Sequence, residues 1–280
     1  MSEEIADATV VTGAERLEAA FATAKSEGRA ALMPYMMGGF PDTAGATAVA
    51  NAYVDGGADL IELGVPFSDP LADGPVIHAA ATAALTSGAH FEDVLSTCRN
   101  VSPRIPVVLM VYTNTVLGVG PDEFARRAID AGASGVIIPD LPWGEDDSII
   151  RVLSDHGLGV VPLIAPTTLP DRRAEICAAA RGFVYVVSTV GTTGEANELP
   201  ADLTELVGHA KDEASAPVAV GFGIGTPGQA AQVGRIADGV IIGSRLVRAV
   251  SEADDSPAAV EAVTSFLTAA RQAMAGSESA

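Results

Sequence analysis

The stretch ELGVPFSDPLADGP, residues 62–75, contains three carboxylates, three prolines and two glycines. The acids are Glu62, Asp69 and Asp73, and no Lys or Arg lies among them. The stretch directly follows DLI, an apolar run typical of a buried strand, and its prolines and glycines indicate a stiff loop. Carboxylates held at a strand end can donate and accept protons, so the spacing predicts general acid–base chemistry.

Strand alternation predicts where the Glu62 side chain points. In DLIELG, residues 59–64, Ile61 and Leu63 face one way, whereas Leu60 and Glu62 face the other. If the aliphatic side chains pack on outer helices, Glu62 points into the interior near the strand end. Burial among apolar neighbours raises the pKa of a carboxyl group and suits it to proton transfer near neutrality. The alternative is a structural glutamate in a salt bridge.

The elements that must position these acids alternate along the 280 residues as short apolar runs and Ala-rich segments. Such alternation predicts parallel βαβ units, and eight units in about 250 residues fit a (β/α)8 TIM barrel, an α/β fold. Strands are expected at residues 31–37, 59–64, 106–112, 134–140, 159–165, 182–188, 217–222 and 238–243. Without a linker-like segment, we expect a single domain over residues 1–280.

The helices have recognisable starts and ends. Residues 121–132 and 226–236 predict helices opened by Pro or Thr-Pro. Glycines within 55–59 and 130–134 are expected to close helices before strands. An extra N-terminal helix over 12–28 is expected to plug the barrel bottom, because Leu17, Ala20, Phe21 and Ala24 follow helical spacing.

Three glycine-rich loops follow the later strands, at residues 191–195, 221–228 and 241–246. The last two run into helices, with Thr226 and Ser244 as expected N-caps. Backbone N–H groups at such helix starts bind phosphate, and Arg245 is the only cation nearby. The alternative is that these glycines only form tight turns.

The composition excludes several kinds of partner. A formal net charge of −20 lacks the basic footprint that nucleic acids and anionic membranes require. No apolar run approaches the roughly 20 residues of a membrane helix. The acidic N-terminus has no signal-peptide pattern. The two cysteines, Cys98 and Cys177, predict reduced thiols in a cytoplasmic protein.

The few lysines and histidines narrow the chemistry further. Lys25 and Lys211 fall in predicted helices, so no strand-end lysine can form a Schiff base. No metal site is expected, because the histidines lack ligand spacing and fall in helical or loop segments: His78, His90, His156 and His209. Cofactor-free acid–base chemistry on a phosphorylated substrate remains, with Glu62 and Asp73 as the pair.

These motifs resemble a known family. Residues 62–75 are similar to the signature of the tryptophan synthase alpha subunit, and four further motifs follow in that family's order: YTN (112–114), PDLP (139–142), GFGI (221–224) and GS (243–244). The resemblance implies a (β/α)8-barrel lyase that cleaves indole-3-glycerol phosphate to indole and glyceraldehyde 3-phosphate in tryptophan biosynthesis. It also implies an alpha2beta2 heterotetramer, whose beta subunit carries PLP and receives indole through a tunnel; this chain would carry no cofactor.

The resemblance also implies roles for single residues. Glu62 and Asp73 match the family's catalytic carboxylates, and Asp69 matches a residue at the beta-subunit interface. Tyr185, predicted by alternation to share a face with Phe183 and Val187, matches an active-site tyrosine. The other implied substrate-binding residues are Tyr112 and, at the phosphate, Gly194, Gly223, Gly243 and Ser244. Two departures from the family are Thr192, where Val is expected, and the segment MMGGFPD (36–42).

The implied reaction accounts for the acidic stretch. Glu62 would protonate indole C3 and then accept the proton of the glycerol hydroxyl beside the breaking bond. Ionised Asp73 would accept a hydrogen bond from the indole N–H, and a nearby cation would weaken that interaction. Two alternatives stay open: a stand-alone indole-glycerol-phosphate lyase that releases free indole, and a catalytically poor barrel that mainly activates a beta subunit.

Overall fold

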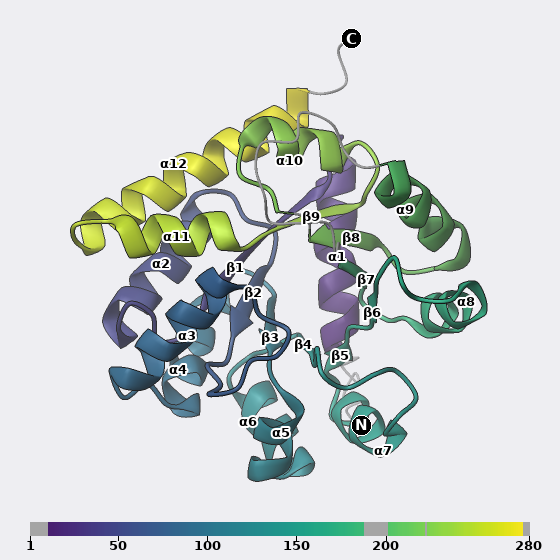
Figure 1. Ribbon diagram of the computed structural model, residues 1–280, viewed down its shortest axis with the longest axis horizontal. Coiled ribbons are helices and arrows are strands. Elements are labelled where there is room, and N and C mark those ends of the chain that lie inside the picture. Colours follow the sequence, from purple (N-terminus) through teal and green to yellow (C-terminus); the bar gives the residue numbers. More distant parts are fainter. Residues whose placement is uncertain (1–10, 188–200, 222, 277–280) are drawn as a thin grey trace, which may run out of the picture.

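The computed structural model describes residues 11–187, 201–221 and 223–276. The strands among them form one parallel sheet. Its order is β5-β4-β3-β2-β1-β9-β8-β7-β6 (Figure 1). The strands are β1 (Ala31–Met37), β2 (Ile61–Gly64), β3 (Val107–Met110), β4 (Gly135–Ile137), β5 (Gly159–Val160), β6 (Leu163–Ile164), β7 (Val184–Val187), β8 (Val218–Gly221) and β9 (Gly239–Ile242).

The fifth predicted strand is broken into β5 and β6, which lie at the two ends of this order. Proline has no backbone N–H, so Pro162 interrupts the ladder between them. The chain nevertheless bridges the gap, because the Val161 amide donates to the Val136 carbonyl (2.9 Å) and the Tyr185 amide donates to the Pro162 carbonyl (2.9 Å). The sheet therefore closes, and the predicted (β/α)8 barrel is confirmed.

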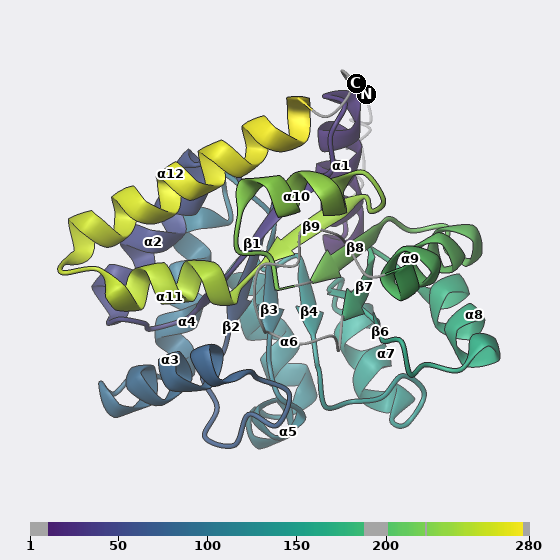
Figure 2. The same ribbon diagram turned by 45° about the horizontal axis from the view of Figure 1, so that its top comes forward.

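Helices surround the strands in both views (Figures 1 and 2). They are α1 (Gly13–Ser26), α2 (Thr43–Asp55), α3 (Pro75–Thr86), α4 (Phe91–Val101), α5 (Thr113–Val119), α6 (Pro121–Asp130), α7 (Asp147–Asp155), α8 (Pro170–Ala179), α9 (Ala201–Glu213), α10 (Pro227–Gly234), α11 (Ser244–Glu252) and α12 (Ser256–Ala275). Within the described residues, no helix combines the length and the apolar character needed to cross a membrane.

The predicted helix signals have the expected geometry. Thr226 caps α10, because its hydroxyl oxygen accepts a hydrogen bond from the Gln229 backbone amide. The Gln229 side-chain oxygen in turn accepts one from the Thr226 backbone amide. Gly57 and Gly132, just after α2 and α6, have φ values of 91° and 82°. These left-handed conformations favour glycine and turn the chain from helix to strand.

The extra N-terminal helix, α1, closes the end of the barrel at which the strands begin, as predicted. Leu17, Phe21 and Ala24 of α1 are buried in the interior core together with residues of the strands. The Phe21 and Phe183 ring centroids are 5.4 Å apart. At the start of β5, a Cβ on Gly159 would lie 3.1 Å from Leu17 Cδ1, so glycine there makes room for the helix.

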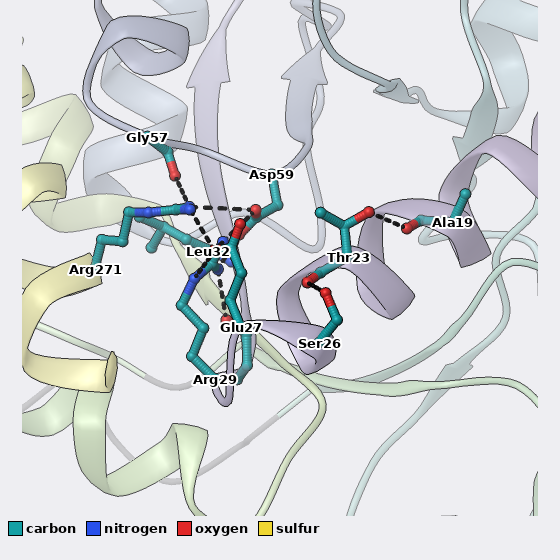
Figure 3. A network of polar contacts seen from close by, with 10 residues as sticks. Ala19, Thr23, Ser26, Glu27, Arg29, Leu32, Gly57, Asp59 and Arg271 are labelled. Atoms are coloured by element: carbon teal, nitrogen blue, oxygen red, sulfur yellow. Dashed lines mark hydrogen bonds and ion pairs between the residues drawn. The ribbon is translucent and has the colours of Figure 1, made fainter. Parts of the chain in front are cut away.

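A buried ion network ties the chain together at the same end of the barrel (Figure 3). Arg29, whose side chain is 2% exposed, donates from Nη2 to Asp59 Oδ1 (2.8 Å) and to Glu27 Oε2 (2.7 Å). Arg271 of α12 donates to the same Glu27 oxygen (2.6 Å) and to the Gly57 carbonyl (2.8 Å). The network joins the segments before β1 and β2 to the last helix.

We predict that Arg29→Ala lowers the free energy of unfolding by about 3 kcal/mol, because it leaves the Asp59 carboxylate buried without its main partner. The matched control is Arg126→Ala on α6. Arg126 also pairs with two acids, Glu123 and Asp130, but these pairs are exposed and screened by water. Urea unfolding of both variants measures the difference, and equal losses would contradict a special role for the buried network.

Candidate active site

Glu62 lies inside the barrel near the carboxyl end of β2, as strand alternation predicts. Leu60 belongs to the interior core, whereas Ile61 and Leu63 pack in the outer core against the helices. Glu62 is 2% exposed, and its Oε2 atom has no hydrogen-bond partner among the described residues. The alternative of a salt-bridged structural glutamate is therefore not supported, since the ion pairs of the described residues do not include Glu62.

The environment of Glu62 favours its neutral form. Burial and, to a smaller extent, the negative charge of Asp73 raise the pKa of Glu62 to about 8. At neutral pH the carboxyl therefore holds its proton and can act as a general acid. The two carboxyl groups therefore interact electrostatically, since the charge of Asp73 disfavours the charged form of Glu62.

Asp73 lies in the acidic loop, residues 65–74, between β2 and α3 (Figure 2). It is partly buried, and burial raises its pKa. The Tyr112 hydroxyl and the nearby His78 act in the opposite direction and favour its charged form. Two neighbouring carboxyl groups thus have different environments, which is the arrangement that separates acid and base roles.

Tyr112, at the end of β3, holds the acidic loop in place. Its ring stacks on Phe67 with centroids 5.1 Å apart, and its hydroxyl accepts a hydrogen bond from the Ala72 amide (3.1 Å). Both contacts lie within a few residues of Asp73. The structure thus places Tyr112 at the site, as a tether of the loop, and its contact with substrate stays a prediction.

The predicted face of Tyr185 is also correct. Tyr185, Phe183 and Val187 contribute to the same interior cluster. Burial and the charge of Glu62 raise the pKa of Tyr185 well above its usual value, so its hydroxyl stays protonated near the acid. A Cβ on Gly221 of β8 would collide with the Tyr185 ring, which explains why glycine stands there.

The predicted phosphate-binding residues that the structure describes lie in the loop before α10 and at the start of α11. Among the described residues, nothing lies within 4 Å of a Cβ on Gly223, and a Cβ on Gly243 would make only ordinary contact with Tyr35, at 3.6 Å. Gly243 has a φ of −110°. Packing within the described residues therefore does not account for either glycine, and left-handed strain does not account for Gly243.

The prediction that Ser244 is an N-cap is wrong by one residue. Gly243 occupies the N-cap of α11 without a side-chain hydrogen bond, and Ser244 is the first helical residue and is exposed. Its backbone N–H is thus one of the unpaired amides of the helix start. Gly194 and Thr192 lie outside the described residues.

Arg245, Lys25 and Lys211 all lie in helices. The Arg245 guanidinium lies 5.2 Å from the centroid of Phe266 on α12, an outer helix. Lys25 is in α1, and Lys211 in α9 pairs with Asp238 at 2.9 Å, so both lysines lie in helices as expected. In the described part of the chain, no group of His, Cys, Asp and Glu side chains is arranged to hold a metal ion.

Asp69 and Leu71 project from the acidic loop into solvent. Asp69 is exposed, and Leu71 is 84% exposed, the largest exposed fraction among the big apolar side chains of the described residues. No hydrogen bond to the Asp69 carboxylate is found within the described residues, whereas a turn-capping aspartate would accept one from the backbone. The loop therefore carries one acid toward the barrel mouth and one toward solvent.

Sequence reasoning missed Tyr35 of β1, whose partner in the ladder is Glu62. It is 4% exposed at the mouth of the barrel. The signal was available, because alternation along residues 31–37 places Met33, Tyr35 and Met37 on one face. Met33 belongs to the interior core, which confirms that this face points inward.

These features define a parallel α/β barrel with two electrostatically coupled carboxyl groups, Glu62 and Asp73. Residues 21–275 match the family described as tryptophan synthase alpha chain. The chain is 44% identical over 237 residues to a tryptophan synthase alpha chain of Carboxydothermus hydrogenoformans, covering 84% of this chain and 89% of that one.

Solved structures agree with this match. A tryptophan synthase structure from Mycobacterium tuberculosis superposes with a TM-score of 0.86 at 38% identity, over 92% of this chain and 98% of that chain. The tryptophan synthase alpha chain of Legionella pneumophila gives a TM-score of 0.85 at 35% identity, over 95% and 99%. The chain belongs to the tryptophan synthase alpha chain family.

Proposed function

We propose that Glu62 and Asp73 carry out, in this chain, the reaction of its family. A tryptophan synthase alpha chain is a lyase of tryptophan biosynthesis that cleaves indole-3-glycerol phosphate to indole and glyceraldehyde 3-phosphate. The observation that carries the assignment of residues is the buried Glu62, with a pKa of about 8, beside Asp73 at the barrel mouth. The stand-alone lyase left open by the sequence is not favoured, since the chain matches the alpha chains along most of its length.

The geometry supports a two-proton role for Glu62. Its protonated carboxyl delivers a proton to indole C3, which turns the ring into a leaving group. The bond between C3 and the glycerol carbon then breaks as the adjacent hydroxyl forms the aldehyde carbonyl, and the Glu62 carboxylate takes up the hydroxyl proton. Asp73 accepts a hydrogen bond from the indole N–H and stabilises the positive charge that develops on the ring.

The phosphate of the substrate is bound by backbone N–H groups of the late loops. Gly223, Gly243 and Ser244 supply the described part of this site, and Gly194 belongs to the same proposal. The space beside Gly223 within the described residues and the absence of a tight contact at Gly243 support it, and the α11 start adds the positive end of a helix dipole. Backbone binding suits a chain with a net charge of −20, because it needs no lysine.

The partner we propose is a PLP-dependent beta subunit in an alpha2beta2 heterotetramer, which takes the indole released here. Asp69 and Leu71 are placed to contact it, since both are exposed and share a loop with Asp73. We further propose a single domain, because helices from both ends of the described chain pack on one barrel. The free, buried thiols of Cys98 and Cys177 fit a reducing cytoplasm.

We predict that Glu62→Gln lowers the turnover of indole-3-glycerol phosphate by at least ~10²–10⁴-fold, because the amide cannot transfer the proton. In the unmodified enzyme, turnover should fall as pH rises through about 8, since the raised pKa of Glu62 keeps the reactive proton below that pH. The control is Glu18→Gln, at the opposite end of the barrel, where the amide oxygen can still accept from the Gly182 amide. Near-normal turnover of folded Glu62→Gln would refute the assignment.

If the phosphate binds as proposed, a bulky side chain at Gly223 should change KM but not the stability of the fold. Gly223→Val should raise KM for indole-3-glycerol phosphate by roughly tenfold or more, because the side chain fills the space where the phosphate approaches the backbone. Binding of plain indole and the urea midpoint should change little. Gly208→Val on the exposed face of α9 is the control for adding a bulky side chain. Equal weakening of both ligands by Gly223→Val would assign this glycine to packing.

Asp69 predicts how the partner couples to cleavage. A beta subunit that binds the exposed acidic loop should favour the position of Asp73 that cleaves substrate, with an activation of roughly 5–150-fold. Asp69→Ala should lose most of this activation and cleave normally when alone. Asp212→Ala, another exposed aspartate on α9, should be activated like the unmodified chain. Turnover with and without saturating beta subunit decides, and full activation of Asp69→Ala would contradict the coupling.

A further inference from the structure

Tyr35 shares the inner face of the sheet with Glu62. The two residues are paired in the β1–β2 register, so their side chains leave adjacent strands on the same side. A Cβ on Gly64 would collide with the Tyr35 hydroxyl. Gly64 follows Glu62 by two residues on the same face of β2, so the Tyr35 ring leans across β2 just above the carboxyl, toward the mouth.

Both polar groups lack partners within the described residues. The Tyr35 hydroxyl forms no hydrogen bond there, and the buried Oε2 atom of Glu62 has none. The neighbouring tyrosine hydroxyls have other partners: Tyr53 donates to the Tyr35 carbonyl (3.1 Å), and Tyr112 accepts from the Ala72 amide and is hydrogen-bonded to the Asp73 side chain. A buried carboxylate without a donor is costly, and a phenol is a suitable donor.

The same arrangement occurs on β7 and β8. Tyr185 lies across Gly221, as Tyr35 lies across Gly64, and each glycine pairs with the residue two positions after the tyrosine. Two phenols therefore approach Glu62 from β1 and β7. Burial and the charges of Asp73 and Glu62 raise the pKa of Tyr35 well above its usual value, so it remains a donor.

We propose that Tyr35 is a positioning residue for Glu62. Once the indole ring has taken the proton, the Tyr35 hydroxyl donates a hydrogen bond to the resulting Glu62 carboxylate. The inference rests on the proposed role of Glu62. A donor to the anion makes Glu62 a stronger acid and orients it to accept the second proton. Within the part of the chain that the structure describes, the charged and titratable groups that interact with Glu62 are Asp73, Tyr35 and Tyr185.

The test is Tyr35→Phe, which keeps the ring over Gly64 and removes only the hydroxyl. Turnover should fall roughly tenfold, the size expected for one hydrogen bond to a charged group, while KM changes by less than about twofold. The fall of turnover at high pH should move upward from about 8, because the Glu62 anion has lost a donor. Tyr53→Phe, which removes a buried hydroxyl on the outer side of β1, should leave this pH profile unchanged.

A second measurement does not depend on activity. Since the raised pKa of Glu62 makes stability fall as pH rises toward 8, urea unfolding of Tyr35→Phe should show a larger loss between pH 6 and pH 9 than the unmodified chain. An unchanged or lowered pH limb, or a rise in KM alone, would overturn the inference. If Glu62→Gln in the same series keeps its turnover, the role of Glu62 itself fails; if only Tyr35→Phe behaves like the unmodified enzyme, this inference alone fails.

Discussion

The desolvation of one carboxyl group, Glu62, is the constraint on which the site depends. The barrel interior is filled with apolar side chains, and a charged group there has lost its water without gaining a partner among the described residues. The pKa of about 8 is the direct result. It also has a cost for folding, because the stability that the proton provides is fully present below the unfolded pKa of about 4.5 and is lost as pH rises through about 8.

The two ends of the barrel divide stability from chemistry. The end at which the strands begin is closed by α1 and by the ion network around Arg29, where each charge has partners. At the end where the strands finish, Glu62 has no ion-pair partner among the described residues. Its neighbour Asp73 lies in the acidic loop, which Tyr112 fixes by a ring stack and one backbone hydrogen bond. Fixing the loop at Phe67 and Ala72 leaves Asp69 and Leu71 exposed between them.

Much of the fold follows from local pattern. Alternation along residues 59–64 and 182–188 placed Glu62 and Tyr185 inside, because a two-residue period leaves one choice once the aliphatic face is known. The break at Pro162 was not predicted, since it depends on which backbone groups meet across the barrel. The N-cap of α11 was misplaced by one residue, because the Gly243 carbonyl, not that of Ser244, accepts the first helical hydrogen bonds. Tyr35 was missed for a similar reason: its significance lies in a ladder partner 27 positions away, which only the β1–β2 register reveals.

The glycines of GFGIG show why part of the site needed the structure. In the sequence, Gly221 and Gly223 are equivalent, two residues apart in one loop-forming motif. In the fold, a side chain on Gly221 would strike the Tyr185 ring, whereas a Cβ on Gly223 would meet nothing within 4 Å among the described residues. The first glycine therefore makes room for the Tyr185 phenol. The second lies where we propose that the phosphate approaches the backbone, so the two glycines of one short motif have different surroundings.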